Sequence, residues 1–415
     1  MSAEMSNLRH LRVFLEVLDS RSISKSSDKV YLSQSAITQA IAKLEDDLNT
    51  SLFHRQSDGM LPTETGLIFE FRVRRALRLI LSGLQGISRI NDGKVIKPSQ
   101  LIHAITTTQL RNLISITQSQ NFSIASRALN VSQSSLHRAA RGLERQLGTV
   151  LFEKTTNGIT SSKAALKLAR LSKLAFNEIT QGREEINTFH NREMGKITIG
   201  SMPLARASIL PTTIIAVNKR FPSFKISVID GIYDDLLYHL RNGEIDLLIG
   251  ALRFPKPSED IQQEKLFDSS IEILARADHP LATIQATENA VTLKKLSAYP
   301  WVVLRPGTPT RALFDKVFTT EGVEMPERIV ESSSQGLVRS LLLGEDWLTM
   351  SSEHQFQHEL GNGSLVKIKF ELIQNPRPIG ITMRKSWNPT GTQLAFVNSL
   401  KEKTRLLTSS VSSFD

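Results

Sequence analysis

The chain has 415 residues, 40% hydrophobic and 22% charged, which is typical of a folded protein of two to four domains. It has no cysteine, so disulfides, thiolate metal sites and cysteine nucleophiles are excluded, and no apolar run is long enough to span a bilayer. The formal net charge of +10 lies entirely in residues 1–192, which indicates a nucleic-acid-binding part or, alternatively, a solvated basic surface without a partner.

Residues 6–62 are predicted to form three short helices and a two-stranded wing, called copy one below. The first helix has apolar residues at helical spacing from Leu8 to Leu18. Ser22 is the expected N-cap of a second helix, Ile23 to Val30, and Ser33 that of a third, Gln34 to Leu48. The exposed positions of the third helix carry side chains of the kind that bind base edges and phosphates, namely Gln34, Ser35, Thr38, Gln39 and Lys43.

A long helical stretch follows, residues 63–97, which we call the first linker helix. We expect it to run from about Thr63 to Ile90, and its apolar positions alternate with a group of arginines. Residues 104–161 then repeat copy one without gaps at an offset of 99, and are called copy two. Matches include Ser33-Gln34-Ser35 with Ser132-Gln133-Ser134, and Leu52-Phe53 with Leu151-Phe152. The corresponding candidates for DNA contact are Ser132, Gln133, Ser135, Arg138 and Arg141.

A second linker helix is predicted over residues 162–192. A helix of this length has an apolar stripe that one small domain cannot cover, so a partner helix is expected. The alternative is packing on the C-terminal half of its own chain. The first linker helix is expected either to pair in the same way or to fold back between the two copies.

Residues 193–405 alternate strands and helices, which predicts an α/β domain of two Rossmann-like subdomains with parallel sheets. Subdomain I is expected over residues 193–268 and 375–405, and subdomain II over 269–374. Ligands bind at the carboxyl ends of such strands, in the cleft between subdomains. The candidate ligand contacts are polar residues that follow predicted strands and the methionine beside one of them, namely Ser201, Met202, Arg305, Thr308, Ser332 and Ser333. Turn and capping roles are the alternative for each.

The motifs of the N-terminal part resemble those of one family. Residues 23–45, followed by Leu52-Phe-His-Arg55 and Thr63-Glu-Thr-Gly66, are similar to the winged helix-turn-helix of LysR-type transcriptional regulators. Residues 122–144 with Leu151-Phe-Glu-Lys154 resemble it again, so the domain is duplicated. Copy two departs from the pattern because it has Gly142 within its recognition helix and lacks Thr-x-x-Gly after the wing. It is therefore either a second reader of bases or a positioning module.

The resemblance implies a ligand-responsive regulator whose C-terminal domain is similar to periplasmic binding proteins. It implies that Arg55 reaches the minor groove or a phosphate, and that Thr63 binds a phosphate. Ser33 and Ser132, at the starts of the two recognition helices, are further candidate DNA contacts. It also implies double-stranded DNA as partner, RNA polymerase if the protein is an activator, and a homodimer through the second linker helix, with a homotetramer expected. The effector is expected to be an anionic small molecule of the sugar, sugar acid or aromatic acid class.

Two other functions remain at this point. One is a nucleoid-type DNA binder with a solute-binding module and little promoter specificity. The other is an enzyme or solute receptor on the same α/β fold. The chain lacks the Gly-rich phosphate loop, the dinucleotide fingerprint, the His-Glu-x-x-His pair and the Gly-x-Ser-x-Gly elbow. His354 and His358 have the spacing of a helical metal pair, but a solvated helix face is the preferred interpretation. We therefore expect no enzyme activity, no cofactor, no metal, no membrane association and a cytoplasmic location.

Overall fold

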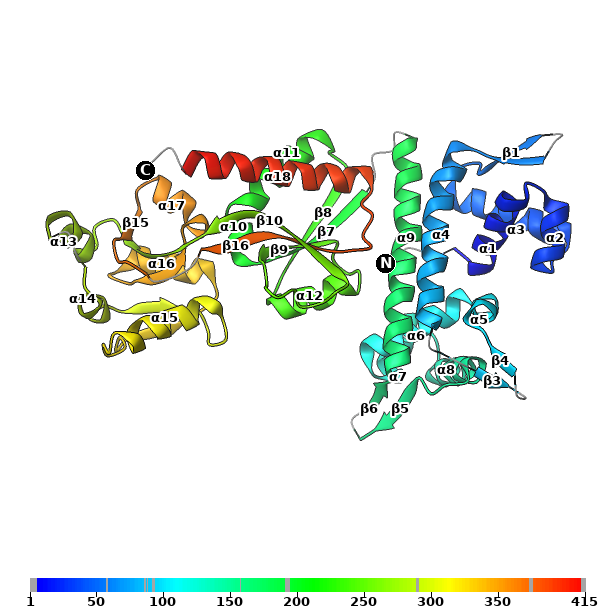
Figure 1. The fold of residues 1–415 in the computed structure, drawn as a ribbon, viewed down its shortest axis with the longest axis horizontal. Coiled ribbons are helices and arrows are strands. Elements are labelled where there is room, and N and C mark those ends of the chain that lie inside the picture. Colours follow the sequence, from blue (N-terminus) through cyan, green and yellow to red (C-terminus); the bar gives the residue numbers. More distant parts are fainter. Residues whose placement is uncertain are drawn as a thin grey trace. The chain divides into compact units, whose positions relative to one another are not determined.

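The computed structural model describes residues 6–56, 59–85, 87, 89–91, 94–156, 158–190, 195–288, 291–372 and 376–411 (Figure 1). The chain forms two compact units, which we describe separately. The first contains residues 1–196 with the short segments 223–225 and 241–244, and the second contains the remainder. The expected domain boundaries at residues 192–193 and 374 lie outside the described residues. In the part of the chain that is described, no helix is both long and apolar enough to cross a membrane.

Copy one has three helices and a wing, and each helix is preceded by a residue whose side chain accepts a hydrogen bond from a backbone N–H group of the first turn. Ser22 and Ser33 accept hydrogen bonds from the first turns of the second and third helices, as their sequence positions predict. The helices bury one face each around Phe14, Ile37 and Leu44. The elements are α1 (Leu8–Ser20), α2 (Ile23–Val30), α3 (Gln34–Leu48), β1 (Phe53–Gln56) and β2 (Gly59–Pro62).

The first linker helix is shorter than the sequence suggests. α4 (Glu64–Leu84) starts at the Thr63 cap but ends six residues before the predicted Ile90, where β3 (Arg89–Asn91) and β4 (Lys94–Ile96) form a hairpin. A short helix, α5 (Pro98–Ala104), then leads into copy two. Copy two repeats the order of copy one with α6 (Thr107–Ser119), α7 (Phe122–Leu129), α8 (Gln133–Leu147), β5 (Phe152–Thr155) and β6 (Gly158–Ser161).

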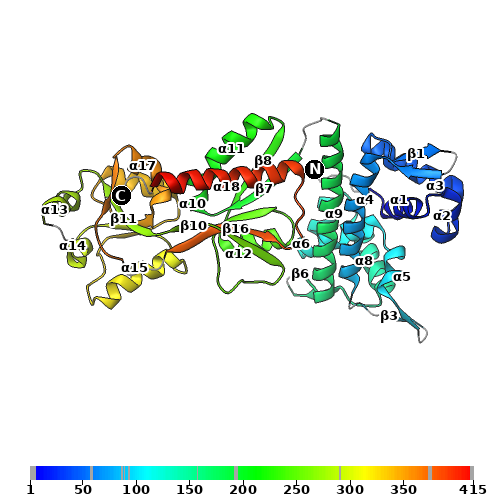
Figure 2. The same cartoon turned by 45° about the horizontal axis from the view of Figure 1, so that its top comes forward.

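The second linker helix, α9 (Lys163–Phe189), packs along α4 of the same chain (Figures 1 and 2). The two helices are antiparallel, because the partner of Phe69 is Gly182 whereas that of Gly83 is Leu168. The expectation that α9 pairs with α9 of another chain therefore differs from the structure. Its apolar stripe is covered by the first linker helix, which folds back between the two copies.

The second unit contains a five-stranded sheet in the order β10-β16-β9-β7-β8. β7 and β9 are parallel, as the βαβαβ pattern predicts, but β16 runs antiparallel to β9 and to β10, so the sheet is mixed. Its elements are β7 (Gly195–Ser201), α10 (Pro203–Ala207), α11 (Ile209–Arg220), β8 (Phe224–Asp230), α12 (Tyr233–Arg241), β9 (Leu247–Ala251), β10 (Ile261–Ser269), β16 (Arg377–Arg384) and α18 (Gly391–Val411).

The rest of the second unit also departs from an all-parallel sheet. β12 and β13 are parallel, whereas β11 pairs with β14 and β15 in antiparallel fashion. Trp301 is fully buried here against Phe314 and Phe318. The elements are β11 (Ile271–Arg276), α13 (Pro280–Glu288), α14 (Leu293–Ser297), β12 (Trp301–Val303), α15 (Pro309–Thr320), β13 (Ile329–Glu331), α16 (Gln335–Gly344), β14 (Thr349–Ser352), the 3-10 turn η1 (Glu353–Gln355), α17 (Gln357–Gly361) and β15 (Leu365–Ile368).

Candidate nucleic-acid interface and effector site

The candidate DNA contacts of copy one lie on the solvent side of α3 and on its wing. The side chains of Gln34, Ser35, Gln39, Lys43 and Arg55 are exposed, and Thr38 is half-buried. Thr38 Oγ1 already donates to the carbonyl oxygen of Gln34 at 2.9 Å, which leaves its methyl group and lone pairs for a ligand. Side chains with free donors and acceptors on an exposed helix can contact base edges in a major groove.

Two of the predicted contacts are engaged in capping. Ser33 Oγ accepts from the backbone N–H of Ala36 at 3.2 Å. Thr63 Oγ1 accepts from Gly66 N at 2.9 Å and donates to the carbonyl oxygen of Ser51 at 2.7 Å. These bonds place the starts of α3 and α4, so any phosphate contact by either residue has to share a hydroxyl that the fold also uses.

Copy two presents a similar but more basic face. Gln133, Ser135 and Arg138 are exposed on α8, while Ser132 caps the helix by accepting from Ser135 N at 3.2 Å. Arg141 is exposed too, but its Nη1 lies 2.7 Å from Glu144 Oε2 in an ion pair. Arg138 is therefore the candidate of copy two whose charge faces solvent most directly.

A glutamate in each copy holds the wing on the recognition helix. Glu45 Oε1 accepts from the backbone N–H groups of Leu52 and Phe53 at 2.7 and 3.3 Å. Glu144 Oε1 accepts from those of Leu151 and Phe152 at 2.9 and 3.0 Å. Because the bonds recur at equivalent positions, both copies place the wing in the same way relative to the helix.

The two copies are related by an approximate two-fold axis within one chain. Leu8 N donates to Thr107 Oγ1 at 3.0 Å, and these residues are equivalent positions of the repeat. Gly83 and Gly182 are equivalent as well, and a Cβ atom on either would come within about 3 Å of the facing helix. Gly83 faces Leu168 and Gly182 faces Phe69, which are also equivalent. Contacts that recur in this exchanged way are the signature of an isologous interface, here formed inside a single chain.

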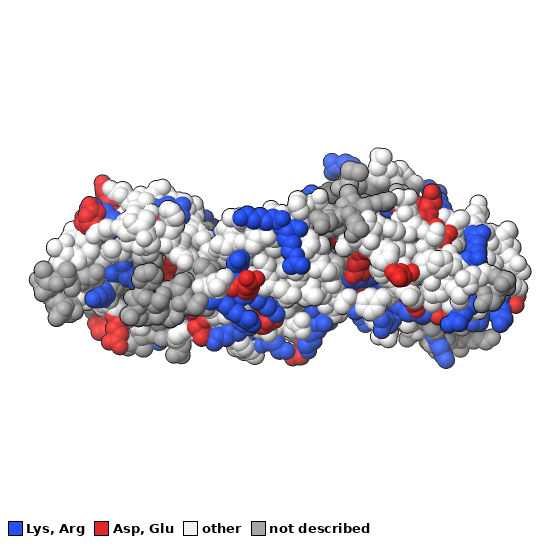
Figure 3. All heavy atoms as spheres, turned by 90° about the horizontal axis from the view of Figure 1, so that it is seen from above, with Lys and Arg blue, Asp and Glu red and all other residues white. Residues whose placement is uncertain are grey.

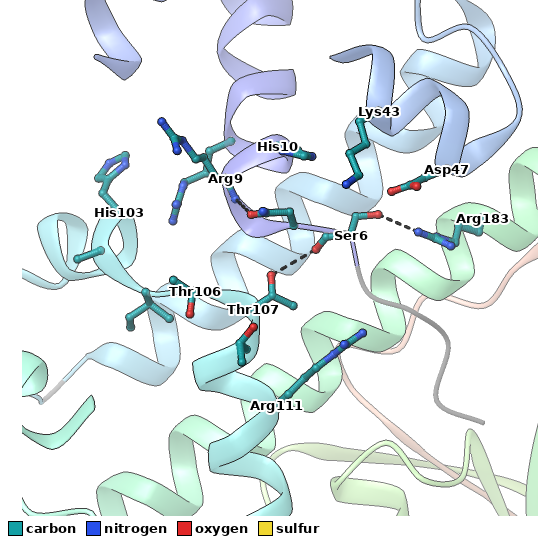
Figure 4. A pocket seen from close by; sticks show the side chains of 15 residues that line it. Ser6, Arg9, His10, Lys43, Asp47, His103, Thr106, Thr107, Arg111 and Arg183 are labelled. Carbon is teal, nitrogen blue, oxygen red and sulfur yellow. Dashed lines mark hydrogen bonds between the residues drawn. The ribbon is translucent and has the colours of Figure 1, made fainter. Parts of the chain in front are cut away.

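A cationic cavity of about 860 Å³ lies beside this axis, between the starts of α1 and α6 (Figure 4). Lys43 and Arg111 extend toward it from opposite sides, and Arg183 of α9 donates to Ser6 Oγ at 2.9 Å at its wall. Asp47 is the one acidic side chain in the lining that the structure describes. The lining residues that carry or can carry positive charge are Arg9, His10, Arg12, Lys43, His103, Arg111 and Arg183.

The excess of Lys and Arg over Asp and Glu is not spread as a continuous basic surface over the molecule. On the face drawn in Figure 3, Lys and Arg side chains are interspersed with acidic ones. The cavity is therefore a local concentration of charge. Burial lowers the pKa of Arg12, and the neighbouring charge of Arg9 lowers it further. Sequence reasoning missed Arg9, Arg111 and Arg183, which come together only when the two copies pack on each other.

The first group of effector candidates follows β7. Ser201 is fully buried, and its Oγ donates to the carbonyl oxygen of Met202 at 3.1 Å. Met202 packs on Gly250 of the neighbouring strand β9, where a Cβ atom would meet its sulfur at 2.4 Å. Both residues thus support the start of α10, and their contribution to a ligand site remains a prediction.

The second group follows two paired parallel strands, β12 and β13. Arg305 and Ser333 are exposed, and Ser332 is buried with its Oγ accepting from Ser334 N at 3.1 Å. Thr308 caps α15 by accepting from Arg311 N at 3.3 Å. The paired strands place these residues at one sheet edge. No described contact joins them to Ser201 or Met202.

A further cation near this edge was not predicted. Arg377 Nη2, at the start of β16, donates to Thr310 Oγ1 in the first turn of α15 at 3.0 Å. Arg377 is half-buried and forms no ion pair with another described residue. Burial lowers its pKa, and the charge of Arg253 adds to that effect. An arginine on a strand that crosses between subdomains is the signal that could have identified it.

Among the described residues, no cluster of three His, Cys, Asp or Glu side chains could hold a metal ion. The proposed histidine pair is not on one helix, because His354 lies in η1 and His358 in α17. His354 is buried against the ring of Phe267, with ring centroids 4.7 Å apart. Burial lowers its pKa.

Comparison with known proteins extends over most of the chain. The profile of the LysR substrate binding domain matches residues 190–405, and that of the bacterial regulatory helix-turn-helix protein, lysR family, matches twice, at residues 8–67 and 107–166. A relative from Pseudomonas putida, the HTH-type transcriptional regulator GalR, is 28% identical over 402 residues, covering 97% of this chain and 98% of its own. An uncharacterized regulator of Escherichia coli, YdcI, is 24% identical and covers 92% of its own length but 69% of this chain. The match to the first relative therefore extends over both copies of this chain, whereas the match to the second covers only part of it.

Two solved structures are similar to this fold. A full-length OxyR variant from Pseudomonas aeruginosa matches with a TM-score of 0.50 and 20% identity over 73% of this chain and 95% of its own. Full-length LysG from Corynebacterium glutamicum, with the effector Arg bound, matches with a TM-score of 0.50 and 17% identity over 72% and 97%.

Proposed function

The chain belongs to the LysR family of bacterial transcriptional regulators, and on that premise we propose that one chain presents both of its winged helices to one DNA site. Regulators of this family bind DNA through the helix-turn-helix and a small molecule through the C-terminal domain, and they are not enzymes. The observation that carries the proposal is the α4–α9 pair, which gives a single chain two recognition helices related by an approximate two-fold axis.

The two heads are proposed to read different half-sites. Gln34, Ser35, Thr38 and Gln39 of copy one supply amide and hydroxyl groups for base contacts, with Arg55 reaching from the wing into the flanking groove. The residues of copy two that differ most from this set are basic, and Arg138 is assigned to the phosphate backbone. Copy one then carries most of the sequence specificity and copy two most of the salt-dependent affinity.

Selection of bound fragments from a random-sequence DNA library by the full chain tests this function. We expect enrichment of two unlike half-sites spaced by about one or more helical turns, roughly 34 Å each. Gln39→Ala is expected to relax the preference in one half-site only, while Arg138→Ala keeps both preferences and weakens binding overall. A library with no enriched motif at fixed salt would instead indicate the nucleoid-type binder.

For the C-terminal domain we propose an anionic effector bound by Arg377 and the N-terminal turn of α15, where Thr308 and Thr310 lie. A half-buried arginine beside a helix N-terminus is a strong attractor for a carboxylate. Arg305, Ser332 and Ser333 are proposed to line the same edge, and Ser201 and Met202 the facing start of α10. Sugar acids and aromatic acids are the proposed chemical classes.

A thermal-shift screen of such acids with the full chain tests the effector site. An acid that stabilises the wild-type protein is expected to lose most of its effect with Arg377→Gln, while Arg305→Gln weakens it less. An equal response of the wild type and Arg377→Gln to every acid would contradict the assignment. We propose further that the protein acts in the cytoplasm, and that higher oligomers form through surfaces other than the α4–α9 stripe, with RNA polymerase as a partner if it activates.

A further inference from the structure

The α4–α9 interface is symmetric in its packing but not in its charges. Its packing repeats across the axis, with Gly83 on Leu168 at one end and Gly182 on Phe69 at the other. The ion pairs that the structure describes between the two helices lie at one end, whereas at the other end Lys167 Nζ donates to the backbone carbonyl oxygen of Gln85 at 3.0 Å. At the end with the ion pairs, the polar end, Arg72 of α4 is bound by Glu178 and Glu185 of α9, and the equivalent of Arg72 at the other end is Leu171.

The polar end is buried and fully bonded. The side chain of Arg72 is completely buried, and its Nη1 donates to Glu178 Oε2 and to Gln181 Oε1, both at 2.9 Å. Its Nε donates to Glu185 Oε2 at 2.8 Å. Arg75 donates through Nη2 to Glu178 Oε1 at 2.8 Å. Burial opposes the charge of Arg72, but the bonds and charges of Glu185 and Glu178 outweigh it and raise its pKa.

The same network would be lost if two chains exchanged partners. In an α4–α4 pair of the same geometry, each Arg72 faces Leu79 and Ser82, the equivalents of Glu178 and Gln181. The one acidic residue of α4 between its first turn and its end is Glu70, and its carboxylate binds Arg74 on another face. An α4–α4 pair would therefore bury two arginines without a counter-charge.

An α9–α9 pair has the complementary fault. Each Glu178 would face Leu171 and Leu174, the equivalents of Arg72 and Arg75. The nearby basic residue Lys173 already forms an ion pair with Glu244. A buried charge that has lost its partner destabilises the wrong pairing strongly, whereas the paired charges stabilise the right pairing only a little.

We infer that the Arg72–Glu178–Glu185 network selects the partner of each linker helix, so that α4 binds α9 and neither helix pairs with its own kind in a second chain. The short hairpin and helix between the copies keep α9 of the same chain close to α4, which adds a high effective concentration to the charge selection. The DNA-binding pair is then complete in one chain, and a second copy has to bind elsewhere. The inference concerns pairing alone and stands whether or not the chain binds DNA as proposed above.

Disulfide trapping tests the pairing, because the chain has no cysteine of its own. Ala76 and Ala175 are equivalent, fully buried, and related by the same register as the Phe69–Gly182 and Gly83–Leu168 contacts. Under mild oxidation, the full-length A76C/A175C variant is expected to form a disulfide within one chain. The A76C variant is expected to stay at least tenfold less cross-linked between chains. Covalent multimers of A76C/A175C, covalent dimers of A76C, or no disulfide in the double variant would overturn the intrachain pair.

Partner selection is tested by adding Arg72→Leu and Glu178→Leu to A76C, which makes these positions as apolar as their equivalents. Covalent dimers are expected to increase at least tenfold on equilibration of the full chain. The matched control adds Glu70→Leu and Arg74→Leu, which remove an ion pair of similar length outside the interface. If both backgrounds cross-link equally, or if neither does, the network does not select the partner.

The cationic cavity carries a second, independent proposal. Arg9, Arg12, Lys43, Arg111 and Arg183 line it, and none of these five forms an ion pair with another described residue. Thr106, Thr107 and Thr108 at the start of α6 line the same space, where Thr106 caps the helix by accepting from Gln109 N at 3.2 Å. We propose that the cavity binds a multiply charged oxyanion of the phosphate type, from a free small molecule or from the DNA backbone between the two heads.

Two measurements with Arg111→Gln distinguish a free oxyanion from a phosphate of the DNA backbone. The control is Arg78→Gln on the outer face of α4, which removes the same charge outside the cavity. Calorimetric titration of the DNA-free chain with inorganic pyrophosphate is expected to show binding that Arg111→Gln weakens at least fivefold if the anion is free. If pyrophosphate does not bind, the salt dependence of DNA affinity is expected to lose about one unit of slope in Arg111→Gln alone. Failure of both effects, or equal effects in the control, would overturn the oxyanion site.

Discussion

Removal of Glu178 tests how much the buried charge network stabilises the first unit. Glu178 accepts three hydrogen bonds at 2.8–2.9 Å, one from Arg72 and two from Arg75, and its side chain is 8% exposed. In Glu178→Leu, Arg72 keeps Glu185 and Gln181 but stays fully buried with fewer partners. Breaking a buried pair in this way costs about 3–5 kcal/mol, and the remaining partners favour the lower end, about 3 kcal/mol.

The double variant Arg72→Leu/Glu178→Leu is expected to lose about the same 3 kcal/mol rather than about 6, because leucine already fills the equivalent positions at the other end. For a unit of this size, 3 kcal/mol corresponds to a decrease of roughly 6–12 °C in unfolding temperature. The two single variants and the double variant form a double-mutant cycle. The coupling free energy between Arg72 and Glu178 that this cycle measures is expected to be about 3 kcal/mol.

Two spectroscopic signals separate the units in the full chain. Trp301, Trp347 and Trp387 all lie in the second unit, so tryptophan fluorescence reports on that unit alone. Loss of circular dichroism at a temperature where the fluorescence is unchanged then reports on the first unit, which is mainly helical. Additive losses in the cycle, or a fluorescence transition that moves with the substitutions, would refute the reasoning.

Three further outcomes are expected. Glu144→Ala leaves the N–H groups of Leu151 and Phe152 without a partner and should destabilise the first unit by about 2–4 kcal/mol, whereas Glu144→Gln should cost less than about 1 kcal/mol in the same melting experiment. Arg138→Ala should reduce the salt dependence of DNA affinity by about one unit, and unchanged slopes would remove it from the phosphate contacts. Burial, the largest contribution, lowers the pKa of His279 from its ordinary 6.5, so the unfolded chain takes up a proton first as the pH falls. Through this group the second unit should keep its full stability above pH 6.5 and lose at most about 1.4 kcal/mol per pH unit below it, a contribution that His279→Asn should remove in fluorescence-monitored urea unfolding.

The sequence predicts the individual domains well because their information is local. The N-caps Ser22 and Ser33 and the apolar spacing of the recognition helix place α2 and α3 at their observed residues. The end of α4 is less well predicted. Nothing in the apolar spacing separates the last helical turn at Leu84 from the apolar residues of the hairpin that follows.

The pairing of the linker helices could not be predicted because it depends on which of two equivalent stripes each helix contacts. Apolar spacing indicates only that a partner exists. Arg72 and Glu178 are 106 positions apart, and their complementarity becomes visible only when the equivalents of both are compared across the repeat. The cavity and Arg377 were missed for the same reason, since each joins residues that no local pattern relates.

The antiparallel linker pair also changes how the protein responds to its own abundance. Two separate chains must meet before they can share a pair of heads, so their paired fraction falls as the protein is diluted. Here the second head is attached through residues 85–106, and pairing is a unimolecular step whose equilibrium is independent of dilution. The DNA-binding unit should therefore stay assembled when a cell contains only a few molecules. Because the two heads have different sequences, each half of the DNA site can also change together with the one head that binds it.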